Sequence, residues 1–416
     1  AQGEYLAAVA ELKSALSRGS DDVQARILLA DLSLQLGDYL SAESEYSRVL
    51  SLAGDDEDAW LGLGRSLLGQ GRPTEALTRV VARFEDPATP AQNVLSGDTY
   101  VTLGNDEPAQ LHYRKALDAD SQNAEALVGL AVIARRAGRR DDALGYLEQA
   151  RLARPDSTQV WIATGNFHAE QKDIESAAAA FERAISQEHE RGTSPTADLL
   201  VARVNLAGLL LDAQQFDAAR RQIDAFDVDF PNHVLGRFLR GRLALGLRDF
   251  PAAENELQRY LARIPDDTRG QAILGVAHFY QNHLLQAEMY LQQAVRAQVG
   301  GEAARRLLAE TQLRLDKPNL ALEILRRAEQ EGASDPHLMT MLGRAQAGVG
   351  NLDEAYAYYE RGLLADVDGS GAALSIAAGL LSIGRESRAI EVLEGLPSAP
   401  GEGFRREVLL IAAHLR

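Results

Sequence analysis

One alanine position recurs along the chain at a nearly constant interval. Ten of the eleven gaps between successive copies are 34 residues, give or take one, and the gap from Ala177 to Ala219 is 42. The copies are Ala8, Ala42, Ala76, Ala109, Ala143, Ala177, Ala219, Ala253, Ala287, Ala321, Ala355 and Ala389. So regular a period indicates one small structural unit repeated along the chain, in which each unit packs on its neighbours rather than around a single central core.

Each unit reads as two short helices. Over residues 25–36, apolar residues recur at helical spacing, and Gly37 then supplies the positive φ that ends a helix at little cost. Asp38 is a good N-cap for a second helix, whose apolar face includes Ala42. The sequence therefore predicts a first helix, helix A, and a second antiparallel helix, helix B, in every unit.

A second position, twelve residues before the alanine, is always small. It holds Ala30, Gly64, Gly97, Ala131, Gly165, Ala207, Gly241, Gly275, Ala309, Gly343 and Ala377. Four residues after the alanine stands a larger residue, such as Tyr113 or Phe181. We expect the small residues to let helices A and B approach closely, and the large residue to fill the space toward the next unit.

This pattern resembles the tetratricopeptide repeat (TPR), whose signature has Trp, Leu-Gly and Tyr in helix A and Ala, Phe, Ala and Pro in helix B. Residues 60–64 read Trp-Leu-Gly-Leu-Gly and residues 161–165 read Trp-Ile-Ala-Thr-Gly. Helix B of one unit is matched by Ala143, Leu147, Ala150 and Pro155. The resemblance implies an all-α, right-handed superhelix (an α-solenoid) of about eleven complete helix pairs with a partial unit at each end.

The register also predicts how the chain is divided. We expect a lone helix B in residues 1–22, an N-terminal lobe over 23–191, a C-terminal lobe over 192–403, and a further helix A or capping helix over 404–416. Because the array starts and stops within a repeat, we expect it to be a segment of a longer one.

The 42-residue gap places about eight extra residues near 188–195. Ser194 and Pro195 resemble an N-cap followed by proline at the first helical position, which predicts a lengthened helix A running to about Ala213. The insertion is either a tolerated loop or a change in the direction of the superhelix.

Composition narrows the classes of partner and of chemistry. The net charge of −17 makes nucleic acid an improbable partner, and a chain with no cysteine has neither disulfides nor thiolate chemistry. No uncharged apolar run reaches the roughly 20 residues that a membrane span needs.

We find no catalytic or cofactor motif in the sequence. His168 and His278 occupy a helix-A position where the family often has tyrosine, and we expect both to pack as ordinary helix residues. His278 and His283 are five residues apart, a poor spacing for one helix face. Residues 366–371 are similar to the start of a calcium loop, but Ala377 stands where the bidentate glutamate is needed. We expect a protein that is not an enzyme and holds no cofactor or metal.

TPR geometry points the second, fifth, ninth and twelfth residues of helix A into a concave groove. The residues expected there are largely apolar, with few charges, and suit an extended or helical protein segment. The candidate partner-binding residues are Val128, Val132, Ile162, Asn166, Val201, Val204, Arg237, Phe238, Arg242 and Phe279. The seventh unit is expected to contribute strongly to partner binding, because arginine and aromatic residues often carry much of the binding energy at interfaces. The alternatives are packing between repeats for the apolar residues and ion pairs for the arginines.

A narrower resemblance covers residues 232–291. The segments 232–236, 238–241, 249–253, 272–275 and 286–291 are similar to the large TPR lipoproteins that accompany exosortase/PEP-CTERM exopolysaccharide systems. This resemblance implies a scaffold in the bacterial cell envelope, periplasmic or outer-membrane-associated, held by a lipid anchor upstream and serving the polysaccharide-synthesis machinery. Two alternatives remain open: a regulatory or substrate-recruiting segment of a larger enzyme such as a glycosyltransferase, and a cytoplasmic adaptor.

Overall fold

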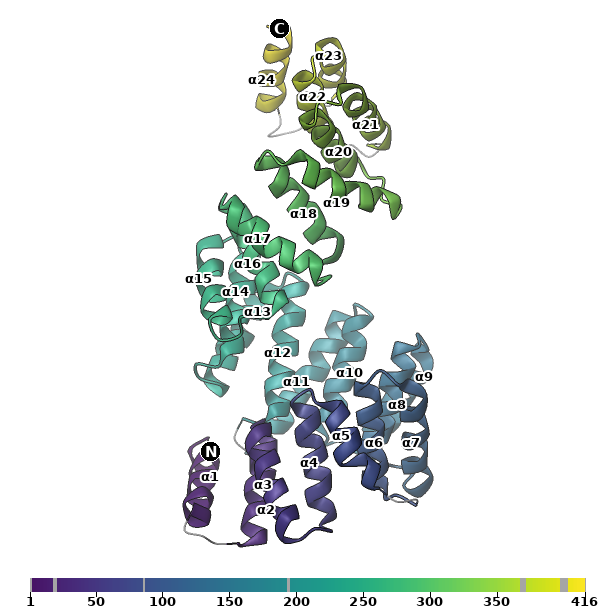
Figure 1. Cartoon of the computed structure of the whole chain (residues 1–416), viewed down its shortest axis with the longest axis vertical. Helices are drawn as coiled ribbons and strands as arrows, with labels where there is room; N and C mark the ends of the chain where they lie inside the picture. The colour runs from purple at the N-terminus through teal and green to yellow at the C-terminus, as the bar shows by residue number, and fades with distance from the viewer. Residues whose placement is uncertain are drawn as a thin grey trace. The chain divides into compact units, whose positions relative to one another are not determined.

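A computed structural model describes residues 2–17, 21–84, 87–192, 195–366, 372–396 and 403–415. These residues form 24 α-helices and one short 3-10 helix, and the described part of the chain contains no strand (Figure 1). None of the described helices is both long and apolar enough to cross a membrane. The chain divides into two compact units, Ala1–Leu239 (unit 1) and Arg240–Arg416 (unit 2), with the boundary inside one helix.

The helices alternate as the repeat predicts. The first part comprises α1 (Gln2–Ser17), α2 (Val23–Gln35), α3 (Tyr39–Leu52), α4 (Glu57–Gly69), α5 (Pro73–Arg79), η1 (Val81–Arg83), α6 (Pro90–Thr102), α7 (Asp106–Ala119), α8 (Ala124–Arg136), α9 (Arg140–Ala153), α10 (Thr158–Glu170), α11 (Ile174–Glu190), α12 (Ala197–Asp212), α13 (Phe216–Asp229) and α14 (Val234–Gly246). The rest comprises α15 (Phe250–Leu261), α16 (Thr268–Tyr280), α17 (Leu284–Arg296), α18 (Gly301–Arg314), α19 (Pro318–Gln330), α20 (Pro336–Gly348), α21 (Leu352–Ala365), α22 (Ala372–Ser382), α23 (Glu386–Gly395) and α24 (Gly403–His414).

Eleven A/B pairs run from α2/α3 to α22/α23, with α1 before them and α24 after them. The predicted all-α array of eleven complete pairs with one extra helix at each end is therefore confirmed. The division into lobes at residue 192 stays a prediction. Of the calcium-like segment, residues 367–371 lie outside the described residues.

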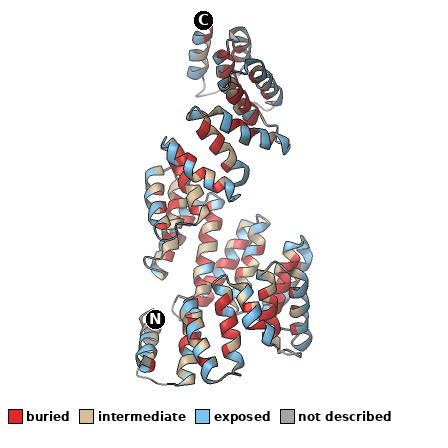
Figure 2. Ribbon diagram, viewed as in Figure 1, coloured by how far each residue is buried: buried red, intermediate tan, exposed pale blue. Residues whose placement is uncertain are grey.

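The recurrent alanine lies at the centre of each pair. From Ala42 to Ala389, every copy has an exposed fraction of 0%. Figure 2 shows buried residues on the facing sides of the helices and exposed residues along their outer sides. The repeat period is therefore the period of the buried contact between helix A and helix B.

A helix-B ring fills the space beside the small position. A Cβ atom on Gly97 would overlap the ring of Tyr113, and a Cβ on Gly129, in helix A of the next pair, would overlap the same ring. Tyr113 itself is 1% exposed. One side chain thus packs on its own pair and on the following one, which confirms the expected role of the large residue.

The insertion mainly lengthens two helices. α11 has 17 residues and α12 has 16, whereas α9 has 14 and α10 has 13. The lengthened helix A is confirmed, but it begins at Ala197 with Thr196 as its N-cap, two residues later than predicted. The proposed cap, Ser194, lies outside the described residues. Thr196 can cap because its Oγ1 accepts a hydrogen bond from the amide of Leu199 at 3.1 Å.

Unit 1 brings its sixth pair back toward its first. A Cβ on Gly37, in the turn between α2 and α3, would lie 3.7 Å from the Cβ of Ala197 at the start of α12. Gly37 has a φ of 75°, as a glycine helix terminator requires. Helices A of the intervening pairs line the concave side between these two points, where the candidate site lies.

Candidate partner-binding groove

A groove of about 970 Å³ lies on the concave side of unit 1, lined by residues from Ile27 to Asp198. Helices A of the first four pairs supply most of its wall, and the start of α12 completes it. The groove is therefore the inner face of the array and not a cavity inside one repeat.

The floor of the groove is apolar. The first two helices A contribute aliphatic side chains at both their fifth and twelfth positions, which are about two turns apart and share a face, whereas α6 and α8 contribute one such residue each. They are Ile27, Leu34, Leu61, Leu68, Val101 and Val128. An apolar floor of this kind suits the hydrophobic side of a bound protein segment.

Acidic side chains stand among these aliphatic ones. The lining includes six carboxylates, from Asp31, Asp58, Asp98, Glu125, Glu188 and Asp198, against two guanidinium groups, from Arg65 and Arg191. Arg191 Nη1 lies 2.7 Å from Glu188 Oε1, and Arg65 Nη2 lies 3.6 Å from Glu125 Oε2. Among the described residues, no arginine or lysine lies within ion-pair distance of the four aspartates. The expectation of few charges is therefore wrong for this groove.

Two of the aspartates are held by buried tyrosines. Tyr46 Oη donates a hydrogen bond to Asp31 Oδ1 at 2.5 Å, and Tyr113 Oη donates one to Asp98 Oδ1 at 2.7 Å. Each ring passes beside a helix-A glycine, so that its hydroxyl reaches the groove. Burial raises the pKa of Asp98 to about 6, against the opposing effect of the Tyr113 hydrogen bond.

The far end of the groove is organised around Glu188. This side chain is 3% exposed, and it accepts hydrogen bonds from Thr158 Oγ1 at 2.5 Å and Thr196 Oγ1 at 2.6 Å as well as from Arg191. Burial and the charge of Glu188 raise the pKa of nearby Asp198. The lengthened α11 thus delivers a carboxylate to the start of α12.

The predicted groove residues fall in several environments. Val128 and Val132 line the groove. Ile162 is buried, and Asn166 accepts a hydrogen bond from Asn205 Nδ2 at 2.9 Å. Val201 is exposed and Val204 is half-buried. The acidic positions of the same helix faces, such as Asp31 and Asp98, were not among the predicted residues.

Of the candidates around the seventh pair, Arg237 and Phe238 belong to unit 1, and Arg242 and Phe279 belong to unit 2. Both arginines and Phe238 are half-buried. Arg314 stacks over the ring of Phe279, with the guanidinium carbon 4.5 Å from the ring centroid. Whether these residues bind a partner stays a prediction.

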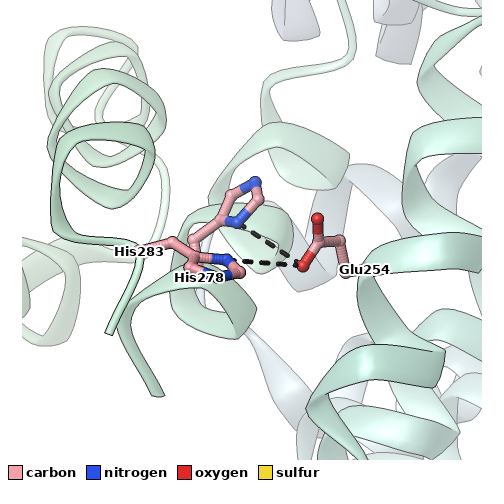
Figure 3. Close-up of side chains that lie close together, drawn as sticks. All are labelled: Glu254, His278 and His283. Atoms are coloured by element: carbon pink, nitrogen blue, oxygen red, sulfur yellow. Dashed lines mark ion pairs between the residues drawn. The ribbon is translucent and has the colours of Figure 1, made fainter. Parts of the chain in front are cut away.

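Two histidines and a glutamate meet within unit 2, although the sequence spacing argued against it (Figure 3). His278 is packed in α16, as expected, but His283 is the N-cap of α17, beyond the turn between the two helices. A rule for spacing on one helix does not apply across a turn, so the objection to a shared site was wrong. Both rings face Glu254 of α15.

Comparisons with known proteins agree on the repeat. The model of the "Tetratricopeptide repeat" family matches residues 130–194, 204–268 and 274–336, and that of the "Tetratricopeptide repeat-like domain" matches residues 1–134. No curated protein matches the chain.

Solved structures of low sequence identity are also similar. The Cut9–Hcn1 hetero-tetramer of the APC/C is 13% identical, with a TM-score of 0.47, over 100% of this chain and 88% of that one. Yeast Tom70 is 15% identical, with a TM-score of 0.42, over 98% and 89%. PilF of Pseudomonas aeruginosa is 22% identical, with a TM-score of 0.37, over 50% and 92%.

Proposed function

We propose, because the chain belongs to the tetratricopeptide repeat superfamily, that it is a non-catalytic scaffold that binds segments of partner proteins on its concave surface. Repeat solenoids present extended concave faces, and such faces bind extended or helical segments through regularly spaced side chains. The groove of unit 1 is the site for which the geometry gives most support.

The charge of this groove defines the class of partner. The observation that carries the proposal is that Asp31, Asp58, Asp98 and Asp198 line a groove with an aliphatic floor, and no arginine or lysine is paired to them in the described part of the chain. A segment that alternates lysine or arginine with apolar residues would complement both features. We therefore propose that the occupant is a basic, amphipathic protein segment.

A peptide-display selection against the full chain tests this proposal. Enriched peptides should carry net positive charge and apolar residues, and raising the salt concentration should weaken their binding. In the variant Asp58→Lys, Glu125→Lys, two exposed groove carboxylates are reversed, and we expect at least tenfold weaker binding in fluorescence anisotropy.

The matched control is Glu107→Lys, Asp141→Lys, which makes the same change in net charge at exposed helix-B positions. This control should change the affinity by less than about twofold, since distant surface charges are screened at physiological salt. Equal weakening by both variants would mean that the peptides respond to overall charge, and enrichment of neutral or acidic peptides would contradict the proposed partner class.

We also propose a cellular setting, assembly or export of bacterial exopolysaccharide at the cell envelope, with a lipid anchor outside this segment. The support is the similarity of residues 232–291 to the TPR lipoproteins of exosortase/PEP-CTERM systems. Deleting the gene should reduce surface polysaccharide without loss of its cytoplasmic precursors, and the gene for the Asp58→Lys, Glu125→Lys variant should not restore it. A deletion strain with normal surface polysaccharide would refute this setting.

A further inference from the structure

We infer that Glu254, His278 and His283 form a binding site for one Zn²⁺ ion in unit 2 (Figure 3). The three side chains come from α15, α16 and the N-cap of α17, and their ligand atoms all lie within 4.8 Å of one another. They therefore join helix B of the seventh pair to both helices of the eighth.

The distances match a shared metal ion better than direct hydrogen bonds. Nδ1 of His278 and Nδ1 of His283 each lie 3.7 Å from Oε2 of Glu254, beyond the usual range of a hydrogen bond. Two ligands at about 2.1 Å from a tetrahedral zinc ion are about 3.4 Å apart. Small side-chain movements would therefore complete the coordination.

A buried nitrogen points into this space without a partner. His278 is 4% exposed, and its Nδ1 is a buried atom with no hydrogen-bond partner. A buried polar atom left unpaired is costly, and a bound ion would satisfy it. The histidine is thus placed to act as a metal ligand.

A second layer of side chains orients the ligands. Gln281 Nε2 donates to Glu254 Oε2 at 2.6 Å, and Gln258 Nε2 donates to Glu254 Oε1 at 2.9 Å. The His278 ring stacks on Tyr290 with a centroid separation of 5.7 Å. Contacts of this kind fix the orientation of metal ligands and raise metal affinity.

Other repeats have different residues at the positions that correspond to Glu254, His278 and His283. At the register of Glu254 and His283, the chain elsewhere has the ion pairs Glu43–Arg72, at 2.6 Å, and Glu288–Lys317, at 2.5 Å. Here a histidine replaces the permanent cation. At the register of His278, those repeats have Leu67 and Gln312. Only this repeat of the three combines a carboxylate with two imidazoles.

Two imidazoles and one carboxylate make a ligand set typical of zinc with an open fourth position. A fourth ligand would be water or a donor atom of a partner. Within the chain, the ion would link α15 to α16 and to the turn before α17, so zinc binding should stabilise unit 2 against unfolding.

Equilibrium dialysis of the full, untagged chain against Zn²⁺, with metal quantification, tests the site. We expect one zinc ion per chain, a melting temperature that rises with zinc concentration, and visible absorption bands of low-symmetry Co²⁺ when cobalt is substituted. His283→Gln and Glu254→Gln should each weaken zinc binding at least tenfold and remove those bands. Neither change opens a cavity, because His283 is exposed and glutamine nearly matches glutamate in size.

His168→Gln is the matched control. His168 stands at the register of His278 in the fifth pair, with Asp173 in place of His283 but Leu144 in place of Glu254. It should leave zinc binding unchanged. The inference is overturned if the chain binds no zinc, or if one zinc ion binds and neither His283→Gln nor Glu254→Gln weakens it. Circular dichroism without metal checks that each variant is folded.

Discussion

The hydroxyl of Tyr113 donates a 2.7 Å hydrogen bond to Asp98 Oδ1, which ties a ring buried between two repeats to a carboxylate in the groove. The same arrangement recurs between Tyr46 and Asp31. The packing core and the binding surface are therefore connected through single side chains, and stability measurements can probe both.

Asp98→Asn should stabilise unit 1 at neutral pH. The pKa of Asp98 is raised from 3.8 to about 6 in the folded state, so the folded protein holds this proton more tightly than the unfolded chain. The stability that the proton supplies below pH 4 is lost as the pH rises to 6, and the loss corresponds to about 3 kcal/mol. Asparagine keeps an acceptor for Tyr113 and carries no charge.

We therefore expect this variant to gain about 1–3 kcal/mol at pH 7.5 and little at pH 4. Urea unfolding followed by tryptophan fluorescence reports on unit 1, because both tryptophans, Trp60 and Trp161, lie there. Asp58→Asn, at an exposed position, should change the free energy of unfolding by less than about 0.5 kcal/mol at either pH. An equal gain from Asp98→Asn at both pH values would contradict the assignment.

Gly129→Ala should destabilise unit 1 although alanine favours helices. A Cβ at this position would overlap the buried ring of Tyr113, and overpacking of this kind costs about 1–3 kcal/mol. Gly145, in the middle of α9, has nothing within 4 Å of a Cβ, so Gly145→Ala should gain up to about 1 kcal/mol. Urea unfolding followed by tryptophan fluorescence measures both changes in the free energy of unfolding. A stabilised Gly129→Ala protein would show that the Tyr113 ring is not confined as described.

Glu188→Ala should be among the more damaging single changes in unit 1. It leaves Arg191, Thr158 and Thr196 without their shared buried acceptor, which should cost about 2–4 kcal/mol. Glu190→Ala, on the same helix but exposed, should cost less than about 0.5 kcal/mol. Similar losses in urea unfolding for the two variants would mean that the Glu188 network does not stabilise the start of α12.

The seventh pair remains a candidate contact region. If Phe238 and Arg242 anchor a partner, Phe238→Glu, Arg242→Glu should lose at least one protein that the wild type recovers in affinity capture with mass spectrometry. The control variant Val228→Glu, Arg263→Glu replaces an exposed valine of α13 and an exposed arginine that follows α15. It should recover every protein that the wild type recovers. Identical recoveries from all three baits would contradict this role.

Sequence patterns predicted the helix pairs well because caps and turns are local. Gly37 and Asp38 mark one turn directly. Turns without glycine were predicted by register alone, and there non-glycine residues take the left-handed conformation: Lys172, Gln214, Arg248, Asn282 and Asp316 have φ between 55° and 62°. The repeat imposes the left-handed conformation at these turns, and the conformational preferences of the individual residues would not have predicted it.

The groove was predicted only in part. The helix-A positions that face inward were identified, yet the acidic ones among them, such as Asp31 and Asp98, were passed over in favour of apolar neighbours. Aligning the repeats and comparing charge at the ninth position would have found both. The Glu188 network, in contrast, depends on how far α11 extends, and the sequence around the insertion did not fix that length.

The approach of Gly37 to Ala197 changes how the first pair should behave. In a simple solenoid, each repeat contacts only the repeats next to it in the chain, so opening one exposes surface only on those neighbours. Here the first pair also meets the sixth, so opening either exposes surface on both. Amide hydrogen exchange in α2 should consequently accelerate when α12 is loosened.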